Sequence, residues 1–265
     1  MALKVVTWNI NGIRPRTENL CRFLSEYQPD LICLQEIKIQ TEDFPGDPFR
    51  ALGYEHQAIA GQKAYHGVAI LSKIPFQDQF SCPWGGEGDA RHVAVNLANG
   101  LEVHSIYIPA GGDKPDPELN VKFDHKLRFW KDMTDWFAEE RSQDQMILAG
   151  GDFNVAPLET DVWNHKRLVK SVGHSPIEVE HLEAAKASLD WTDLPREYVP
   201  ADQFLYSWWG YRYKLAVEKD YGWRLDHSWA TPALKDKVTN SEVIKPTRLW
   251  ERPSDHVPIM TEIDL

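Results

Sequence analysis

The chain is organised around Gln145-Met146-Ile147-Leu148-Ala149-Gly150-Gly151-Asp152-Phe153-Asn154, in which an apolar run passes through two glycines to an acid and an amide. The apolar part, Met146–Ala149, has the length of a strand that is buried on both faces. The glycines allow the backbone to turn sharply or to approach another segment closely. Asp152 and Asn154 lie two residues apart, so in an extended chain their side chains point to the same side.

This strand end has two interpretations. A carboxylate beside an amide at the end of a strand suits the handling of a water molecule and a phosphate. The same two residue types also form β-turns in which the side chains bond only their own backbone. The stretch by itself does not decide between a site and a turn, so the other strand ends of the chain carry the argument.

The composition restricts the class of protein. A length of 265 residues fits one large α/β domain or two small ones, and 42% apolar residues are enough for a core. The eleven tryptophans suit either core packing or stacking on bases and sugars. A net charge of −11 argues against a protein that holds nucleic acid through bulk positive charge, but it allows a basic rim around an acidic, metal-loaded pocket.

The cysteines and the N-terminus predict a soluble cytoplasmic protein. Cys21, Cys33 and Cys82 form no CxxC motif and no disulfide framework, which is typical of a reducing compartment. The chain starts with the strand-like segment Leu3–Trp8 in place of the apolar core of a signal peptide, and no stretch has the length of a membrane span. No Pro/Ser-rich linker divides it, so we expect a single domain over residues 1–265.

Short apolar or β-branched runs, bounded by turn residues, predict a chain that is rich in strands. The Pro/Gly-rich stretch Ser81–Asp89 is expected to be a loop, and Val162–Ser175 a loop or a short helix. The aromatic stretch Phe204–Tyr213 is assigned to the strand-rich last third. The other predicted strands are Lys4–Asn9, Leu31–Leu34, Ala51–Gly61, Gly67–Ser72, Arg91–Leu97, Leu101–Ile108, Gly222–Trp229, Ser241–Ile244 and Ile259–Ile263.

Helical spacing of apolar residues marks three segments: one from Leu20 to Tyr27, and the stretches Glu118–Arg141 and Glu178–Leu189. In the longest of them, the apolar stripe runs from Phe123 to Phe137. Its polar face carries lysines that we expect to be solvated: Lys122, Lys126 and Lys131.

An apolar strand that ends in two polar residues at alternate positions occurs twice. The first instance ends in Asn9 and Asn11, and the second in Asp152 and Asn154. A two-halved sandwich of two sheets accounts for such a repeat.

The informative polar residues share a position at strand ends, where a rigid scaffold can assemble them into a pocket. They are carboxylates and amides without a Cys/His cluster, a set that favours Mg²⁺ or Mn²⁺ over zinc. The chain has no P-loop, HExxH or GxSxG motif. Metal-assisted hydrolysis of a phosphoester uses all of these groups. They are Asn9, Asn11, Glu36, Tyr107, Asp152, Asn154, Asp226, Asp255 and His256.

Each of these residues also has a structural explanation when taken alone. Glu36 can be a surface carboxylate, Tyr107 a core tyrosine, and 254–256 a capping turn. Alternation along Gly222–Trp229 places Asp226 and His227 on opposite faces, and only Asp226 is favoured for the site. The histidines without a recognisable partner are interpreted as structural or surface residues: His66, His92, His104 and His125.

The motifs at these strand ends resemble, in their order, those of the exonuclease III family of AP endonucleases, within the endonuclease/exonuclease/phosphatase superfamily. The resemblance extends over essentially the whole chain and is closest to the compact bacterial form. The motifs are Thr7-Trp8-Asn9-Ile10-Asn11-Gly12-Ile13-Arg14, Leu34-Gln35-Glu36, Tyr107-Ile108-Pro109, Gly151-Asp152-Phe153-Asn154-Val155-Ala156-Pro157, Trp223-Arg224-Leu225-Asp226 and Ser254-Asp255-His256-Val257-Pro258.

The resemblance implies a four-layered α/β sandwich, in which two mixed β-sheets pack face to face and are flanked by helices. It implies a monomeric hydrolase that cleaves duplex DNA on the 5′ side of an abasic site and leaves a 3′-hydroxyl. It also implies 3′-phosphodiesterase activity on blocked 3′ ends and 3′→5′ exonuclease activity, in unknown proportion.

Catalytic roles follow from the same resemblance. Asp152 corresponds to the residue that aligns and deprotonates the attacking water, and Asn154 and Asn9 would orient that water, Asp152 and the phosphate. Asp226 would hold His256, whose protonated form would bind the scissile phosphate. Together these residues would stabilise the charge of the transition state.

The resemblance also implies a metal site and a phosphate contact. Glu36 corresponds to the main ligand of Mg²⁺ (or Mn²⁺), with Asn11 near it. Asp255 would be a further acidic group at a second metal position. Tyr107 would contact the phosphate or support the leaving group.

Substrate contacts are implied as well. Trp208, Trp223 and Leu225 match positions that line the pocket for the abasic sugar, where an apolar wall admits a baseless sugar and excludes a normal nucleotide. Core packing is the alternative for each of them, and for Trp209 it is the favoured interpretation. Arg14, together with Lys38 and the lysines of 122–131, is a candidate for a basic rim that contacts DNA.

The chain departs from the family pattern at several positions. Ala110 follows Tyr107-Ile108-Pro109 where relatives often carry Asn or Gln, and Asn11 stands where some relatives have Asp. The segments 162–176 and 214–220 have no confident match. These departures leave the balance between endonuclease and exonuclease open.

Two alternatives compete with the nuclease. One is a phosphatase or phosphodiesterase of the same superfamily that acts on RNA, phosphoinositides or sphingomyelin. The other is a DNA-damage-binding protein without activity, which would lack one of Glu36, Asp152 and His256; all three are present. The Trp223 and Leu225 wall favours DNA.

Overall fold

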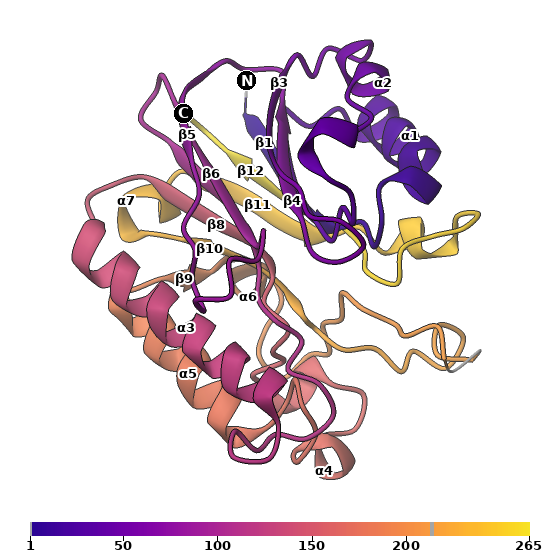
Figure 1. Cartoon of the computed structure of the whole chain (residues 1–265), viewed down its shortest axis with the longest axis vertical. Helices are drawn as coiled ribbons and strands as arrows, with labels where there is room; N and C mark the ends of the chain where they lie inside the picture. The colour runs from indigo at the N-terminus through magenta and orange to yellow at the C-terminus, as the bar shows by residue number, and fades with distance from the viewer. Residues whose placement is uncertain (1, 213–214) are drawn as a thin grey trace.

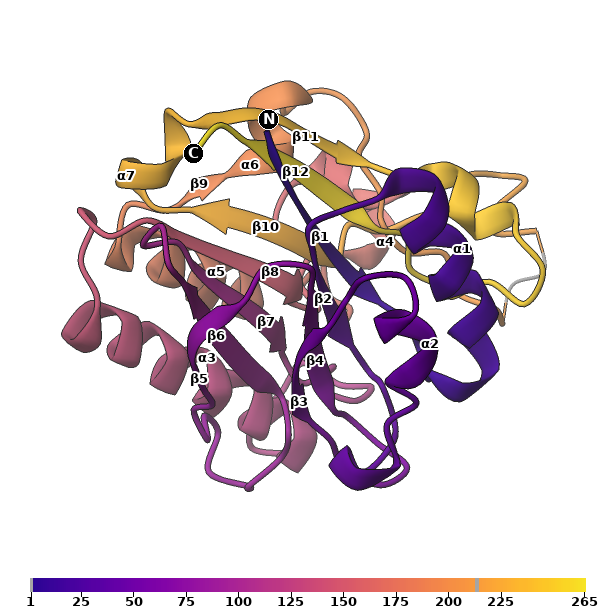
Figure 2. The same ribbon diagram turned by 90° about the horizontal axis from the view of Figure 1, so that it is seen from above.

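The computed structural model describes residues 2–212 and 215–265. Two six-stranded mixed sheets pack face to face, and helices cover both outer faces, which confirms the expected sandwich (Figures 1 and 2). Tyr213, at the end of the aromatic stretch, and Lys214, at the start of the unmatched segment 214–220, lie outside the described residues.

The first sheet, sheet A, is built from both ends of the chain. Within it only β1 and β2 run parallel, because α1 crosses between them. Its strands, in spatial order, are β11 (Val238–Val243), β12 (Ile259–Ile263), β1 (Leu3–Asn9), β2 (Leu31–Gln35), β4 (Val68–Ser72) and β3 (His56–Ala60).

The second sheet, sheet B, comes from the middle of the chain. Its parallel pair is β7 and β8, which are joined through α3. Its strands, in spatial order, are β5 (Phe76–Phe80), β6 (His92–Leu97), β7 (Glu102–Tyr107), β8 (Ile147–Asp152), β10 (Asp226–Ala230) and β9 (Thr192–Asp193). The twofold pattern in the sequence therefore corresponds to one parallel strand–helix–strand unit in each sheet.

The helices differ in length and position. Apolar side chains of α1 and α2 pack on the outer face of sheet A, and those of α3 and α5 on the outer face of sheet B. The α-helices are α1 (Thr17–Tyr27), α2 (Asp47–Arg50), α3 (Val121–Glu140), α4 (His165–Leu168), α5 (Pro176–Ser188), α6 (Leu194–Tyr198) and α7 (Pro232–Lys235). Short 3-10 helices span Arg14–Arg16, Thr41–Asp43, Glu159–Asp161 and Lys245–Leu249. No helix in the described ranges is long and apolar enough to cross a membrane.

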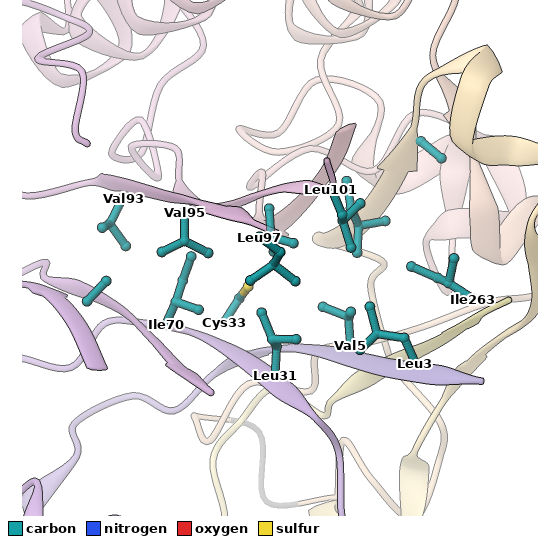
Figure 3. Packing of buried hydrophobic residues seen from close by; sticks show 14 of the residues in the cluster. Leu3, Val5, Leu31, Cys33, Ile70, Val93, Val95, Leu97, Leu101 and Ile263 are labelled. Atoms are coloured by element: carbon teal, nitrogen blue, oxygen red, sulfur yellow. The ribbon is translucent and has the colours of Figure 1, made fainter. Parts of the chain in front are cut away.

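The side chains between the two sheets change from apolar to polar along the strands. At one end it is an apolar core that includes Val5, Leu31 and Leu101 (Figure 3). Further along, the inward positions become small or polar: Gln35 donates hydrogen bonds to the hydroxyl of Thr7 within sheet A and to that of Ser105 in sheet B. Since strand side chains alternate, the next inward positions are those of the predicted polar residues.

The secondary structure differs from the prediction at three places. The stretch Ala51–Gly61 is not one strand, because Asp47-Pro48 begins α2 and Gly53, with φ of 92°, follows its end; only His56–Ala60 is extended. In the described part of Phe204–Tyr213, only two isolated bridges form, one from Trp208 to Trp223 and one from Trp208 to His256. The edge strand β5 was not expected, because its middle residues are polar and exposed.

A fourth correction concerns Lys126. Its side chain is fully buried and forms an ion pair with Glu178 of α5, so it does not belong to a solvated helix face or to a basic rim. The packing of α3 on α5 explains the difference, because it covers part of the polar face of the helix. A single helix pattern cannot reveal such a partner.

Candidate active site

The two sheets are joined at their polar end by the side chain of Asn9. Its amide nitrogen Nδ2 lies 2.9 Å from Glu36 Oε1 and 2.8 Å from Asp152 Oδ2. Asn9 ends β1 in sheet A, Glu36 directly follows β2, and Asp152 ends β8 in sheet B. The structure thus brings three of the predicted residues into direct hydrogen-bond contact.

Both predicted strand ends also close a turn. Asp152 Oδ1 accepts a hydrogen bond from the backbone N–H of Asn154, and Asn9 Oδ1 accepts one from that of Asn11, each at 3.0 Å. Site and turn therefore coexist, because each side chain uses one polar atom for the turn and the other for the bridge between the sheets.

The residues that follow these turns leave the extended conformation. Asn11 and Asn154 have φ of 49° and 55°, in the left-handed region that Asn tolerates. The Nδ2 of Asn154 donates to the carbonyl of Ile108 at 2.9 Å. The same-side arrangement was predicted for an extended chain, a conformation that neither Asn11 nor Asn154 adopts.

His256 faces Asp152 from the loop before β12. Its Nδ1 lies 2.8 Å from Asp226 Oδ2, and its Nε2 lies 3.8 Å from Asp152 Oδ2. Burial alone would lower the pKa of His256, but Asp226 and Asp152 raise it to about 10. The imidazole therefore stays protonated at neutral pH, and its Nε2 faces Asp152.

Asp226 is fixed in turn by Ser207. The Ser207 hydroxyl donates to Asp226 Oδ2 at 2.6 Å and accepts hydrogen bonds from the backbone N–H groups of Leu225 and Asp226. Ser207 is fully buried. No sequence motif indicates this residue, because it lies 19 positions from the carboxylate that it holds.

The acid–base properties of Asp152, Glu36 and Tyr107 differ. Burial raises the pKa of Asp152, and Asp226 and Glu36 add to the shift against the opposing charge of His256. Burial alone would raise the pKa of Glu36 as well, but Lys38 and the hydrogen bond from the Asn9 amide bring it below its ordinary value. Burial followed by the charges of Glu36 and Asp152 raises the pKa of Tyr107 well above its ordinary value, so its phenol stays protonated.

One group among the described residues has the composition of a metal centre: Glu36, Asp152 and His256. Their ligand atoms lie within 4.8 Å of one another. The charge on His256 makes it a poor ligand, which leaves carboxylate oxygens and hence a donor set for a hard cation. Lys38 Nζ lies 2.6 Å from Glu36 Oε2, so a cation already neutralises this carboxylate.

Asn11 and Asp255 lie beside this group but bond each other. Asn11 Nδ2 donates to Asp255 Oδ1 at 2.8 Å, and the Trp208 indole donates to Asp255 Oδ2 at 3.0 Å. Asn11 Oδ1 accepts a hydrogen bond from Lys38. Asp255 thus connects Asn11, which lies beside Glu36 and Lys38, to Trp208.

The predicted substrate contacts fall into three groups. Trp208 and Trp223 line a common pocket of about 500 Å³, with ring centroids 6.3 Å apart. Leu225 is 8% exposed and does not line it. Arg14 is exposed, and its guanidinium lies 3.8 Å from the Asp43 carboxylate. Trp209 is buried, as its core interpretation predicted.

Comparisons with known proteins agree on the family of this fold. Residues 6–256 match the model of the Endonuclease/Exonuclease/phosphatase family. The chain is 31% identical to the exodeoxyribonuclease III of Haemophilus influenzae, over 98% of this chain and 99% of the relative.

Two solved structures are similar over the same extent. An AP endonuclease from Archaeoglobus fulgidus has a TM-score of 0.92 and 29% identity, over 99% of this chain and 100% of that one. A 3′ phosphatase from Neisseria, solved with a product DNA hairpin, has a TM-score of 0.91 and 28% identity, and each chain is covered completely.

Proposed function

Since the chain belongs to the endonuclease/exonuclease/phosphatase family and is a DNA repair nuclease of the exodeoxyribonuclease III type, we propose that it hydrolyses the phosphodiester 5′ to an abasic site in duplex DNA. The products would be a 3′-hydroxyl and a 5′-phosphate on the abasic unit. We include 3′-phosphodiesterase and 3′→5′ exonuclease activity, because both break the same bond type at a 3′ end.

The contact of Asn9 with both Glu36 and Asp152 carries this proposal. It positions a carboxylate with a raised pKa opposite the protonated His256, with 3.8 Å between Asp152 Oδ2 and His256 Nε2. A proton acceptor beside a fixed positive charge suits the attack of a water on a bound phosphate.

The proposed roles follow from these contacts. Asp152 takes the proton of the attacking water, because its raised pKa makes it a better base than an ordinary aspartate. His256 binds a non-bridging phosphate oxygen through Nε2–H, while Asp226 holds Nδ1–H and keeps the ring oriented. Tyr107, which stays protonated, donates a hydrogen bond to the phosphate or the leaving oxygen.

Asn9 and Asn154 have supporting roles in this scheme. Asn9 holds Asp152 Oδ2 in place, so only part of the carboxylate is free to receive the proton. Asn154 fixes the other oxygen, Oδ1, through its backbone N–H. Both contacts limit rotation of the base.

We propose Mg²⁺ (or Mn²⁺) as the cofactor, held mainly by Glu36 and with Asn11 and Asp255 close by. The oxygen-rich donor set suits a hard ion, which when bound would neutralise charge on the phosphate. Lys38 would have to share Glu36 with the ion or leave it for a DNA phosphate, because both cations address the same carboxylate.

Trp208 and Trp223 form the wall for the abasic sugar in this proposal, and Arg14 contacts the DNA backbone. Every proposed site residue comes from one chain, so a monomer suffices. Replacing Trp223 by Ala should reduce abasic incision more than affinity for undamaged duplex. Equal losses would make Trp223 a packing residue only.

The test uses duplex DNA with one tetrahydrofuran abasic analogue, incubated with the protein in Mg²⁺ and in EDTA. Incision 5′ to the analogue in Mg²⁺ alone is the expected result. No incision in Mg²⁺ would reject the proposal, and equal incision in EDTA would reject the metal role. An RNA duplex of the same sequence distinguishes an RNA phosphodiesterase, which would cut it at least as well.

A further inference from the structure

Gln35 belongs to the Leu34-Gln35-Glu36 motif, but the proposed function gives it no role. Its side chain is fully buried between the two sheets, at the end of β2 and directly before Glu36. Burying an amide is costly unless its hydrogen bonds are made. The contacts of Gln35 therefore indicate what a buried amide contributes at this position.

Gln35 connects sheet A to sheet B through Ser105 of β7. Its Nε2 donates to Ser105 Oγ at 2.9 Å, and the Ser105 hydroxyl donates to the carbonyl of Leu34 at 3.1 Å. Ser105 is fully buried. One hydroxyl thus makes two hydrogen bonds to β2 of the opposite sheet. Gln35 Nε2 also donates to Thr7 Oγ1 at 3.0 Å, within sheet A.

This connection lies beneath the contact of Asn9 with Asp152. In sheet A, Asn9 pairs with Gln35. In sheet B, Ser105 pairs with Gly150, which lies two residues before Asp152. Two residues of a strand are roughly 7 Å long. The two hydrogen-bonded connections therefore join the same two pairs of strands at successive inward positions.

The sheets come close together at this level because Gly150 has no side chain. A Cβ on Gly150 would lie 3.2 Å from Thr7 Cβ of the opposite sheet. On the other flank of β8, the hydroxyls of Ser228 on β10 and Thr261 on β12 share a hydrogen bond at 3.1 Å. Hydrogen bonds between the sheets therefore lie on both sides of the close approach, where they resist separation of the sheets.

We propose that Gln35 and Ser105 are positioning residues, whose connection sets the distance between the sheets and thereby keeps Asp152 against Asn9. The inference rests on the proposed function, in which Asp152 is the base and Asn9 holds one of its oxygens. Without the Ser105 hydroxyl, β7 and β8 are less restrained relative to β2, so the base shifts relative to the phosphate. A shift of about 1 Å at a reacting group can cost roughly 10²-fold in rate, even when the altered residue does not touch the substrate.

The test compares two losses of a hydrogen bond to the same amide. Ser105→Ala removes the bonds between the sheets, whereas Thr7→Val removes the bond within sheet A and keeps the shape of the side chain. Single-turnover incision at tetrahydrofuran is measured at saturating Mg²⁺, and duplex affinity is measured in EDTA. Ser105→Ala should cut about tenfold more slowly with unchanged affinity, and Thr7→Val should cut at the wild-type rate.

Two further variants at the same position separate positioning from folding. Ser105→Thr restores the hydroxyl and should recover most of the rate. If Ser105→Ala does not fold, Ser105→Cys takes its place, because the thiol has a similar size and forms weaker hydrogen bonds.

The side-chain amide of Asn9 supplies a readout that does not depend on activity. Its Nδ2 donates to both Glu36 and Asp152, so its hydrogens should exchange slowly with solvent. NMR of metal-free protein with isotope-labelled asparagine measures this exchange, and the signal is assigned by its absence from Asn9→Ala. We expect Ser105→Ala to speed the exchange about tenfold and Thr7→Val to leave it unchanged.

Equal effects of Ser105→Ala and Thr7→Val on incision and exchange would overturn this inference alone, as would a Ser105→Ala variant that matches the wild type in both. A wild type that does not incise the duplex would overturn the proposed function. In that case the exchange rates still decide whether Ser105 keeps Asn9 against Asp152: faster exchange in Ser105→Ala only would support the positioning role, and equal rates would reject it.

Discussion

Lys126 of α3 and Glu178 of α5 form an ion pair in which both side chains are fully buried. Lys126 also donates to the carbonyl of Asn154 at 2.7 Å, and Glu178 accepts hydrogen bonds from the backbone of Gly173 and Ser175. The pair thereby connects α3 and α5 to Asn154, which follows Asp152, and to the loop that contains Gly173.

Removing one partner of this pair should destabilise the protein strongly. Lys126→Met leaves the Glu178 carboxylate buried without its cation, which typically costs about 3–5 kcal/mol. Urea denaturation measures the loss. In Lys126→Met/Glu178→Gln the loss should be smaller than the sum of the single losses, because no charge then remains unpaired.

Lys131→Met supplies the matched control on the same helix. Lys131 is exposed and forms an ion pair with Asp135. The denaturation midpoint of Lys131→Met should therefore equal that of the wild type. Strictly additive losses for Lys126 and Glu178 would contradict the proposed coupling.

Catalytic substitutions should separate chemistry from binding. Asp152→Asn removes the proposed base while its shape is kept, and His256→Ala removes the proposed phosphate contact. Each should lower the single-turnover incision rate at tetrahydrofuran by about 10²–10⁴-fold, with duplex affinity largely retained. Quenched single-turnover assays measure the incision rate, and fluorescence anisotropy measures the duplex affinity on the same DNA.

Asp135→Asn, on the exposed face of α3, is the control and should behave as the wild type. A parallel fall of affinity and incision in Asp152→Asn, with unchanged turnover of the bound DNA, would assign Asp152 to binding.

Strict strand alternation explains why the sequence could predict which side chains face the space between the sheets. On β10, alternation places Asp226 between the sheets, where it holds His256, and His227 on the outer side, where its ring stacks on Phe153. The periodicity of two decides such a choice whatever the partner strand is. Alternation likewise directs Asn9 and Asp152 toward each other across the sandwich.

The sequence did not predict contacts that depend on a left-handed residue or on a distant element. Asn154 has a positive φ, a conformation that no apolar pattern reveals. Ser207 and the partner of Lys126 come from segments whose position is set only by the packing of the whole chain. Periodicity determines the face of an element, but it does not determine what covers that face.

Stability should depend on pH through His256. In the native protein its pKa is about 10, whereas in the unfolded chain it is close to the ordinary value of about 6.5. The stabilisation is therefore complete below pH 6.5 or so and is lost as the pH rises toward 10, at a rate on the order of 1 kcal/mol per pH unit. Urea denaturation in EDTA at several pH values measures this loss.

His256→Gln serves as the reference for this measurement, because it removes the titrating imidazole and keeps a polar side chain of similar size. The difference in unfolding free energy between the two proteins should shrink from pH 7 to pH 10. Curves that stay parallel over this range would show that His256 is not held in its protonated form.

DNA affinity should fall steeply with salt despite the net charge of −11. Phosphate contacts release counterions, so the logarithm of the binding constant falls with the logarithm of the salt concentration. Lys122→Ala should reduce the magnitude of this slope by about 0.9, the value for one lost phosphate contact. Lys235→Ala, on α7 and paired with Glu197, should leave the slope unchanged. A salt-independent affinity would argue against a duplex substrate.

The two glycines before Asp152 should respond very differently to a methyl group. A Cβ on Gly151 would lie 1.9 Å from the backbone oxygen of Ile106, on the neighbouring strand β7. A Cβ on Gly150 would lie 3.2 Å from Thr7 Cβ, across the sandwich. Gly151→Ala must therefore displace a paired backbone and with it Asp152, whereas Gly150→Ala needs only a small movement of a side chain.

We expect Gly151→Ala to cost at least about 1–3 kcal/mol of stability, the range for overpacked sites, and to reduce incision through the displaced Asp152. Gly150→Ala should cost less, and Thr7→Ser should recover part of that loss, because it removes the Thr7 methyl 3.4 Å from the added Cβ. No side-chain substitution can relieve Gly151→Ala, since its contact is with backbone. Urea denaturation of the three variants and the wild type measures the difference, and equal losses at the two glycines would show that the close approach of the strands does not limit position 151.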